Sequence, residues 1–501
     1  MRKRLPVESA TMSLPIIIQG GMGVGVSNWK LARAVSQQGQ LGVVSGTLLA
    51  VVLARRLQQG DPGGDLRRAL ALFPVSGVAE RILATYFVPG GLPADASYKL
   101  TPLPTLPGNP ALTELTVAAN FVEVLLAKEN HTGLVGLNLL EKIQIPTLPS
   151  LYGAMLAGVD YVLMGAGIPR AIPGVLDQLA RGEAAQLKID VSDTATPPSD
   201  VFASFDPRQF CGGPAPVLKR PRFLAIVSSA VLATTLARKA SGRVDGFVIE
   251  TEAAGGHNAP PRGPLQLTPS GEPLYGERDR PDIEKIRALG LPFWLAGAHA
   301  NSAQLAEARR LGAAGVQIGT AFAFCEESGL SPTLKHEVCV LAQAGCAHIH
   351  TDPHASPTKF PFKVFQHPDT LSNPVIYAER PRVCDLGYLR ETYVKPDGTF
   401  GYRCPSEAVV DYARKGGNSA DTVNRKCLCN ALVSSIGLGQ HTDRHDEPPL
   451  ITAGYDVANL TRFFTPDRLH YQAADVIRVV LKSCVNVTAP QNAFESVTEP
   501  K

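Results

Sequence analysis

The sequence lacks an apolar run long enough to cross a membrane. No stretch approaches the roughly 20 consecutive apolar residues that a membrane helix needs. The basic start, Met1-Arg-Lys-Arg, is not followed by the apolar core of a signal peptide before Pro15. We therefore expect a cytoplasmic protein with no membrane partner.

Large charge excess and an even set of cysteines are also missing. The formal net charge of +3 is too small to indicate nucleic acid as a partner. Nine cysteines in 501 residues are an odd count, which argues against a secreted disulfide framework. Classes that depend on a strong basic surface or on disulfide staples are thereby excluded.

What is present is ordinary globular composition, with 45% hydrophobic and 19% charged residues, in a chain long enough for one large core and more. Short apolar runs alternate with helical patterns, which predicts parallel βα units. The expected strands are 15–19, 41–45, 133–139, 161–164, 223–227, 246–250, 293–296 and 316–318. This spacing predicts an α/β fold of the (β/α)8 TIM barrel type, although a further strand-like run at 187–191 leaves the strand count open by one.

Two parts of the chain depart from the alternation. Residues 47–130 read as an insertion after the second strand that could cover the site, with helical patterns and a segment rich in proline and glycine. We place a domain boundary near residue 330, between a barrel domain, 1–330, and an irregular, partly helical C-terminal extension, 331–501. Helices are expected in the extension at 331–344, 455–464 and 474–483, and a cysteine-rich segment at 384–429.

The first candidate site follows the strand at 246–250. Two acids, small residues, Gly255 and Gly256 come next, and then His257. The glycines allow a tight turn and a close approach to a flat ligand. In a βα-repeat protein this end of the strand carries the chemistry. Taken alone, the motif also fits an ordinary loop with a surface histidine.

A second candidate is the glycine-rich turn from Gly20 to Gly25, which links a strand to a helix that begins at a Ser27 cap. It fails as a dinucleotide fingerprint, because Val26 stands where the third glycine belongs and no acid ends the second strand. The glycines either let the backbone lie against a flat ring or serve a tight turn.

The ends of the last two expected strands indicate a phosphate site. Gly297 and Ala298 follow one strand, and Gly319 and Thr320 follow the other. Small residues leave backbone amides accessible to an anion, and barrels often bind a phosphate at this place. Either loop alone would be no more than a tight turn, but together they predict a phosphorylated cofactor.

Five motifs together resemble the nitronate monooxygenases, also called 2-nitropropane dioxygenases, and their relatives the flavin-dependent enoyl-acyl-carrier-protein reductases. The motifs are Ile18-Gln-Gly-Gly-Met22, Gly136-Leu-Asn138, Ala254-Gly-Gly-His257, Leu295-Ala-Gly297 and Leu311-Gly-Ala-Ala-Gly-Val-Gln-Ile-Gly-Thr320. The resemblance covers roughly residues 14–365 and implies a barrel that binds FMN without a covalent link.

Carried over by position, the resemblance assigns the site residues. It implies that His257 is the catalytic residue and that the flavin lies against a set of small and polar residues. That set is Gly20, Gly21, Met22, Asn138, Glu250, Gly255 and Gly256 around the ring, with Gly297, Ala298, Gln317, Ile318, Gly319 and Thr320 at the phosphate.

Three positions depart from the family pattern. Glu250 stands where the monooxygenases commonly have glutamine and the reductases commonly have glutamate. Gly21 replaces the usual proline, and Ala298 replaces the usual second glycine. The departures affect the inferred substrate class more than the cofactor.

Three functions remain open on the sequence. The first is a nitronate monooxygenase-like enzyme that oxidises nitronates or nitroalkanes with oxygen. The second is an NAD(P)H-dependent enoyl-thioester reductase working with a polyketide or fatty acid synthase, whose acyl chain would pass the loop 258–281. The third is a non-catalytic scaffold, which a complete site argues against. We expect a small-molecule or acyl-thioester substrate and allow for a homo-oligomer.

The cysteine-rich segment is a candidate metal centre. Cys384, Cys404, Cys427 and Cys429 lie in a poorly hydrophobic region that a zinc ion or an iron–sulfur cluster would stabilise. The Cys-x-Cys spacing is not the usual one, so buried free thiols are the alternative. The tract with His348, His350 and His354 is interpreted as polar loop histidines.

Overall fold

The computed structural model describes residues 14–192, 200–442, 445–465 and 467–482. Eight parallel strands form one sheet in the order β1-β11-β10-β9-β8-β4-β3-β2. They are β1 (Ile17–Gln19), β2 (Gly42–Ser45), β3 (Val135–Leu140), β4 (Tyr161–Gly165), β8 (Arg222–Val227), β9 (Gly246–Glu250), β10 (Phe293–Ala296) and β11 (Gly315–Ile318). The predicted (β/α)8 barrel is confirmed.

The barrel closes between β1 and β2, where the backbone ladder is shortest. Ile18 pairs with Leu41 in a single parallel bridge. Two buried glutamines supply further acceptors at this seam. The Oε1 atom of Gln19 accepts the amide of Val43 at 2.9 Å, and the Oε1 atom of Gln40 accepts the amide of Ile17 at 2.8 Å. Side chains thus satisfy amides that a longer ladder would have paired.

The run predicted at 187–191 does not join the barrel. Its residues fall in β5 (Ala185–Lys188), which pairs with β7 (Phe202–Phe205), and in β6 (Val191–Ser192), which pairs with β14 (Glu391–Val394). The pattern of β5 explains this, since its side chains alternate between buried and exposed, whereas those of the barrel strands β2, β4 and β10 are buried throughout. The count of eight barrel strands is thereby resolved.

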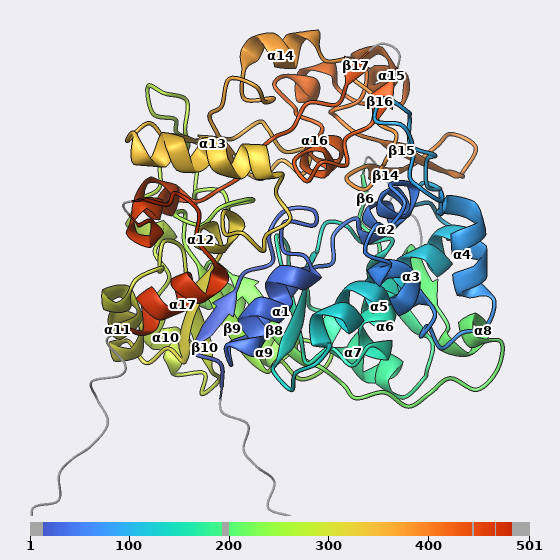
Figure 1. Ribbon diagram of the computed structural model, residues 1–501, viewed down its shortest axis with the longest axis horizontal. Coiled ribbons are helices and arrows are strands. Elements are labelled where there is room, and N and C mark those ends of the chain that lie inside the picture. Colours follow the sequence, from blue (N-terminus) through green and yellow to red (C-terminus); the bar gives the residue numbers. More distant parts are fainter. Residues whose placement is uncertain (1–13, 193–199, 443–444, 466, 483–501) are drawn as a thin grey trace, which may run out of the picture.

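Helices surround the barrel strands, and the last of them comes from the end of the chain. The ring contains α1 (Trp29–Gln37), α5 (Pro110–Lys128), α6 (Thr147–Leu156), α7 (Ile172–Ala180), α9 (Ala230–Lys239), α10 (Ile283–Arg287), α11 (Ser302–Arg310) and α17 (Ala473–Leu481). Helix α17 packs against both α11 and α1 and so stands between the last and the first helix of the barrel (Figure 1). The boundary near residue 330 stays a prediction, but residues on both sides of it contribute to this ring.

The N-terminal cap of α1 differs from the prediction. Asn28, not Ser27, accepts the capping hydrogen bond from the amide of Leu31. Ser27 instead donates its hydroxyl to the carbonyl of Gly20 and accepts the amide of Met22, so it holds the glycine-rich turn.

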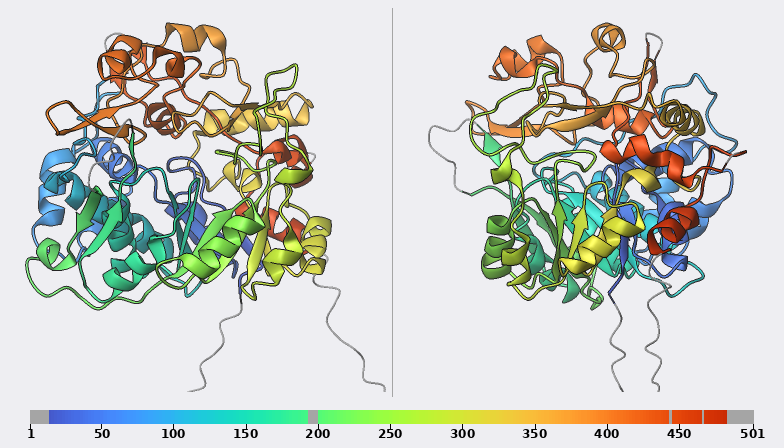
Figure 2. Two further views of the ribbon diagram at one scale, coloured as in Figure 1. Left: turned by 180° about the vertical axis from the view of Figure 1, so that it is seen from behind. Right: turned by 90° about the vertical axis from the view of Figure 1, so that its left-hand side faces the viewer.

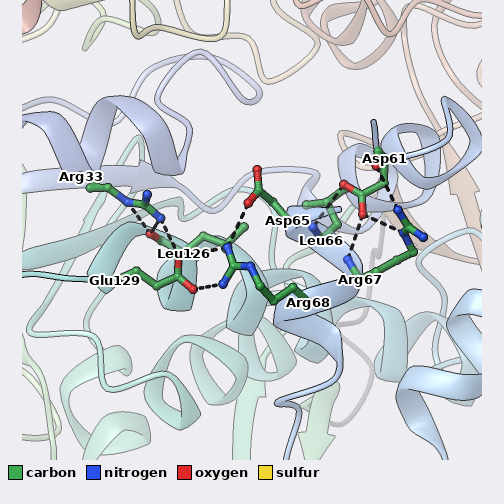
Figure 3. A network of polar contacts seen from close by, with 8 residues as sticks. All are labelled: Arg33, Asp61, Asp65, Leu66, Arg67, Arg68, Leu126 and Glu129. Atoms are coloured by element: carbon green, nitrogen blue, oxygen red, sulfur yellow. Dashed lines mark hydrogen bonds and ion pairs between the residues drawn. The ribbon is translucent and has the colours of Figure 1, made fainter. Parts of the chain in front are cut away.

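Residues 47–130 contain four helices, α2 (Leu49–Gln58), α3 (Asp65–Leu70), α4 (Val78–Tyr86) and α5. Helix α5 packs against α1 and α6, so it takes the place of a barrel helix, and the other three pack against it. Figure 3 shows a polar network that joins α1, α3 and the end of α5. Glu129, which follows α5, pairs with Arg33 of α1 and with Arg68 of α3.

Helix α5 is long and apolar enough to cross a membrane by length and composition, with a mean hydropathy of 1.4. The expectation that no run approaches a membrane span was wrong by this measure of length and composition. In the fold, 72% of that window is buried among the neighbouring helices. Its apolar character is therefore that of a core helix.

Residues 324–472, here called the mouth layer, lie between α12 (Thr320–Ala323) and α17. Figures 1 and 2 show them as a layer across one end of the barrel. The elements not yet given are α13 (Pro332–Gln343), β12 (Ile349–Asp352), β13 (Phe362–Phe365), α14 (Pro374–Glu379), β15 (Phe400–Arg403), α15 (Val409–Arg414), η2 (Ser419–Thr422), α16 (Leu428–Ser434), β16 (His441–Thr442), β17 (His445–Asp446) and η3 (Tyr455–Phe463). The helix predicted at 455–464 is a 3-10 helix, and those at 331–344 and 474–483 form as α13 and α17.

The mouth layer has its own small core and one buried ion pair. Leu371, Leu428 and Leu450 belong to an apolar cluster separate from the barrel. Arg380 donates two hydrogen bonds to Glu447, at 2.6 and 2.9 Å, and both residues are buried. Removing one partner of such a pair would leave an uncompensated charge. The layer is thus held in one arrangement over the carboxyl ends of the strands.

Candidate active site

A cavity opens at the carboxyl ends of β1, β9, β10 and β11. It has about 730 Å³ of empty space, including the open space at its mouth. We call it the cofactor cavity. Every predicted cofactor-binding residue except Asn138 lines it. These are Gly20, Gly21, Met22, Glu250, Gly255, Gly256, Gly297, Ala298, Gln317, Ile318, Gly319 and Thr320. Parallel strands bring these distant segments to one edge, which is the usual place for a site in a barrel.

The glycines of the cavity are required by close contacts. A Cβ atom at Gly255 would lie 2.8 Å from the amide nitrogen of Gly454. At Gly297, with a φ of 99°, it would lie 2.4 Å from Thr251 Oγ1. Ala298 follows with a φ of 58°, a left-handed conformation that costs a residue with a side chain about 1–2 kcal/mol. The backbone after β10 is therefore held in a turn that exposes it to the cavity.

Asn138 lies behind the cavity wall. A Cβ atom at Gly21 would lie only 2.2 Å from the Cβ atom of Asn138. The chain therefore cannot carry the family's usual proline at residue 21 while Asn138 keeps this position. The Oδ1 atom of Asn138 is buried and has no hydrogen-bond partner among the described residues.

The lining side chains of the cofactor cavity include no lysine or arginine among the described residues. Those that ionise are Glu250, His299 and Asp456. Two buried polar atoms of the lining, Gln317 Oε1 and His299 Nδ1, have no partner within the described part of the chain. A phosphate here would be held by backbone amides, and unpaired polar atoms are available for the rest of a polar ligand.

Glu250 separates the cofactor cavity from a second one, here called the substrate cavity, because it lines both. The substrate cavity has apolar walls at Ile168, Ile226, Leu232 and Phe360 and about 930 Å³ of empty space counted to its mouth. Burial raises the pKa of Glu250 to about 7. The carboxyl is thus able to change its charge near neutral pH.

His257 lines the substrate cavity and not the cofactor cavity. Its Nε2 atom lies 2.7 Å from Ser356 Oγ, and its ring packs edge-on against Phe362 at 4.8 Å between centroids. Burial lowers the pKa of His257 to about 4, so the imidazole is neutral at physiological pH. Whether it lies over a bound flavin, as predicted, stays a prediction.

The mouth layer supplies lining residues that the sequence analysis missed. Thr452, Ala453 and Asp456 line the cofactor cavity. Thr452 Oγ1 accepts the amide of Gly256 at 2.9 Å, and Thr320 Oγ1 accepts the amide of Gly454 at 2.8 Å. No motif marks this segment, because its role depends on a contact between residues about 200 positions apart.

A buried lysine also lies close to the site. Lys363 donates its backbone amide to Gly256 at 3.0 Å, and its side chain is fully buried. Its Nζ atom donates to Thr351 Oγ1 at 2.7 Å and lies 3.6 Å from the ring centroid of Tyr455. Burial lowers the pKa of Lys363 to about 8. These contacts hold β12, β13 and η3 together beside the turn that carries His257.

The candidate metal centre is not formed, and the alternative of free thiols holds. Within the described ranges, no group of three or more His, Cys, Asp or Glu side chains could hold a metal ion. Cys404, Cys427 and Cys429 are buried free thiols, and Cys384 is a partly buried one. Cys384 instead forms a side-chain hydrogen bond with Cys404. Among the described residues, the histidines at 348, 350 and 354 do not come together as a metal site either.

The chain was compared with known proteins. The family model of nitronate monooxygenase matches residues 211–352. A comparison with curated proteins gives no match.

Three solved structures illustrate what the chain is similar to. FabK from Thermotoga maritima shares 16% identity and a TM-score of 0.42, with 93% of this chain and 92% of that chain covered. Nitroalkane oxidase from Streptomyces ansochromogenes shares 12% identity and a TM-score of 0.43, with 95% of this chain and 96% of that chain covered. The enoyl reductase domain of MlnA from Bacillus amyloliquefaciens shares 11% identity and a TM-score of 0.45, with 93% of this chain and 92% of that chain covered.

The matched residues 211–352 include β8 to β11, both strand ends of the expected phosphate site, and the turn that carries His257. These are the parts in which the sequence motifs and the two cavities coincide. Over these residues the chain is similar to the nitronate monooxygenase family.

Proposed function

We propose that the chain is an FMN-dependent oxidoreductase that reduces the double bond of a neutral α,β-unsaturated thioester. The fit to FMN is supported by the glycine contacts at residues 21, 255 and 297 and by the unpaired polar atoms of Gln317 and His299. Bound FMN would exchange a hydride with the substrate, with NAD(P)H as the electron donor. The residues of the chain would bind FMN, orient the substrate and exchange a proton with it.

The charge of the substrate cavity carries the choice of substrate. Its lining holds three carboxyl groups, those of Glu250, Glu252 and Asp279, against one guanidinium, that of Arg262. His257 adds no charge, because its pKa is far below 7. A nitronate anion would be repelled by an acidic lining, whereas a neutral thioester would not. The apolar wall at Ile168, Ile226 and Leu232 suits an acyl chain.

Each residue then has a defined role. The loops at 297–298 and 319–320 would hold the FMN phosphate on backbone amides, and Gly21, Gly255 and Gly256 would let the backbone approach the ring. His257 would exchange a proton with the carbon next to the thioester carbonyl. Glu250, between the cavities, sets the local charge beside the ring.

Oxidation of nitronates is the second candidate, favoured by the family match over residues 211–352. A nitronate carries its negative charge before it binds, so His257 would have no proton to remove. A low histidine pKa is compatible with that role. The two candidates differ in electron donor, since a nitronate would reduce FMN itself and the thioester reductase needs NAD(P)H.

Anaerobic mixing of the yellow protein separately with NADPH, NADH and propyl-2-nitronate distinguishes the candidates. We expect a reduced nicotinamide to bleach the flavin, and crotonyl-N-acetylcysteamine thioester to restore its colour. Bleaching by the nitronate alone would establish the second candidate. A colourless protein that takes up no added FMN would refute both.

His257→Asn tests the proton role. We expect it to keep FMN and to bleach with the nicotinamide as fast as the wild type. Turnover of the thioester should fall by about 10² to 10⁴, the usual effect of removing a general acid or base. Full thioester turnover in this variant would rule out His257 as the proton-transfer group.

A further inference from the structure

We propose that His257 is the inner end of a proton relay that runs through Ser356 and Thr358 to a separate cavity, which lies between the mouth layer and residues 142–146 and 189–192. The proposal deepens the function proposed above, since it rests on His257 as the group that exchanges the substrate proton. Ser356 and Thr358 act through His257 and are positioning residues in this scheme.

Three side chains form an unbroken line of hydrogen bonds. His257 Nε2 lies 2.7 Å from Ser356 Oγ, and Ser356 Oγ lies 2.8 Å from Thr358 Oγ1. Ser356 is fully buried. His257 lines the substrate cavity, whereas Thr358 lines a different, open cavity, here called the outer cavity. The line therefore joins two spaces that share no lining residue.

The rest of the network is compatible with one direction of these hydrogen bonds, which the relay requires. The Ser356 oxygen already accepts the backbone amide of Thr358 at 3.2 Å. A hydroxyl has one donor and two acceptor sites. Accepting the Thr358 hydroxyl as well would fill both acceptor sites of Ser356 and leave its proton for His257 Nε2. In this arrangement the neutral imidazole carries its own proton on Nδ1, which then is the nitrogen left for the substrate.

The backbone around Ser356 is held rigidly, as a relay requires. Arg425 donates to the carbonyls of Ser356 and His354, at 2.6 and 2.9 Å. On the other side, residues 257 and 362 form an antiparallel bridge. Both ends of the segment 354–362 are thus fixed, one by Arg425 and the other by the turn that carries the histidine.

The outer cavity is suited to supply the proton. It has about 1060 Å³ of empty space counted to its mouth, and Lys142, Asp190 and Glu391 lie in its lining with Thr358. These charged side chains favour water in their part of the cavity, although Ile145, Ile189 and Leu389 also line it. Water in this cavity can reach Thr358 without entering the substrate cavity.

The proposed step is balanced in protons. A hydride added to the double bond leaves a negative charge that is shared between the α carbon and the thioester oxygen. The α carbon takes the Nδ1 proton of His257, and Nε2 takes the hydroxyl proton of Ser356 as the Nδ1–H bond breaks. Ser356 is reprotonated by Thr358, and Thr358 by a water molecule, which leaves hydroxide to be neutralised by buffer. The step leaves the proton of His257 on Nε2. The Nδ1 tautomer is restored before the next turnover when Nδ1 takes a proton from water in the substrate cavity and Nε2 returns its proton along the same line to the outer cavity.

The test compares two variants at residue 358 and one at residue 356 with a matched control. Thr358→Val keeps the volume and removes the hydroxyl, Thr358→Ser restores it, and Ser356→Ala breaks the first link. Thr370→Val is the control, because the Thr370 hydroxyl also pairs with a serine two residues on, at 2.9 Å to Ser372 Oγ, in the mouth layer. Thermal unfolding of each variant shows whether it is folded.

We expect Thr358→Val to lower thioester turnover about 10-fold, Ser356→Ala to lower it further, and Thr358→Ser and Thr370→Val to leave it within about 2-fold of the wild type. Bleaching by NADPH should be unchanged in all of them. Turnover is also measured as a function of the fraction of heavy water in the solvent. In the wild type this dependence should indicate that more than one proton moves in the step, and in Thr358→Val that only one does. Wild-type turnover and an unchanged dependence in Thr358→Val would overturn the relay.

Nitrogen-15 NMR of histidine-labelled protein keeps this test separate from that of the proposed function. The relay requires the neutral His257 tautomer with its proton on Nδ1, and it requires the Nε2 signal to shift in Ser356→Ala. If the wild type reduces no thioester but shows this tautomer and shift, the relay stands and the substrate assignment falls. A proton on Nε2 in the wild type would overturn the relay whatever the substrate.

Discussion

At the residue scale, the most informative side chain is Glu250, the wall between the two cavities. Its carboxyl lies at the end of β9, whose other four residues are buried, and burial raises its pKa to about 7. The folded-state pKa is above the value in the unfolded chain. The carboxyl therefore contributes stability that is fully present below the unfolded pKa and is lost as the pH rises through about 7.

Glu250→Gln removes this dependence. Between about pH 4 and pH 8, the free energy of unfolding of the wild type should fall relative to that of the variant by up to about 3 kcal/mol. Urea unfolding of both proteins at the two pH values measures the difference. His257 titrates in both proteins, so its effect cancels. A constant gap between the two unfolding free energies would show that Glu250 does not titrate in this range.

At the element scale, α17 shows that the barrel depends on the end of the chain. Val476 and Val480 of α17 are fully buried, and the helix packs against α1 and α11. The chain leaves the barrel after β11, builds the mouth layer, and returns to place its last helix. A fragment ending near residue 330 would leave the faces of α1 and α11 that α17 covers exposed to water.

Val476→Ala should therefore destabilise the barrel, by about 1–3 kcal/mol, because it leaves a cavity between three helices. Arg478→Ala, on the exposed face of the same helix, should change the free energy of unfolding by less than about 0.5 kcal/mol. Urea unfolding followed by the fluorescence of Trp294, which is buried inside the barrel, reports on the right part of the molecule. Equal stabilities of the two variants would show that the packing of α17 does not stabilise the barrel.

At the scale of the whole molecule, the cofactor cavity is built jointly by the barrel and the mouth layer. Thr452 accepts the amide of Gly256, and Asp456 is held by Arg462 at 2.9 Å, while Arg462 donates to the carbonyl of Ala300 at 3.0 Å. The loops after β9 and β10 are thus each tied to the segment 452–462. Cofactor binding should report on this contact even when the fold is intact.

Thr452→Val tests the joint construction, since it keeps the shape and leaves the Gly256 amide without its acceptor. We expect the dissociation constant of FMN to rise about 5- to 10-fold, the effect of losing one hydrogen bond of about 1 kcal/mol. Thr461→Val, at an exposed position of the same segment, should bind FMN as the wild type does. Fluorescence titration of the apoprotein with FMN measures both constants, and equal constants would contradict the joint site.

Local sequence determined the elements that depend only on neighbours. The eight barrel strands are short apolar runs between turn residues, so their order and type follow from the pattern. The glycines at 297 and 319 and the turn ending at His257 follow the ends of those strands. In a barrel all strand ends meet at one edge, so the predicted cofactor residues other than Asn138 come together on one cavity.

Only the tertiary structure decided what depends on contacts between distant residues. Helix α17 and the segment 452–456 have no motif, because their roles are set by surfaces that lie more than 100 residues away in the chain. The pairing of His257 with Ser356 and the pKa values of His257 and Glu250 are likewise absent from any local pattern. Burial and hydrogen bonding fix a side chain's chemistry, and both exist only once the chain has folded.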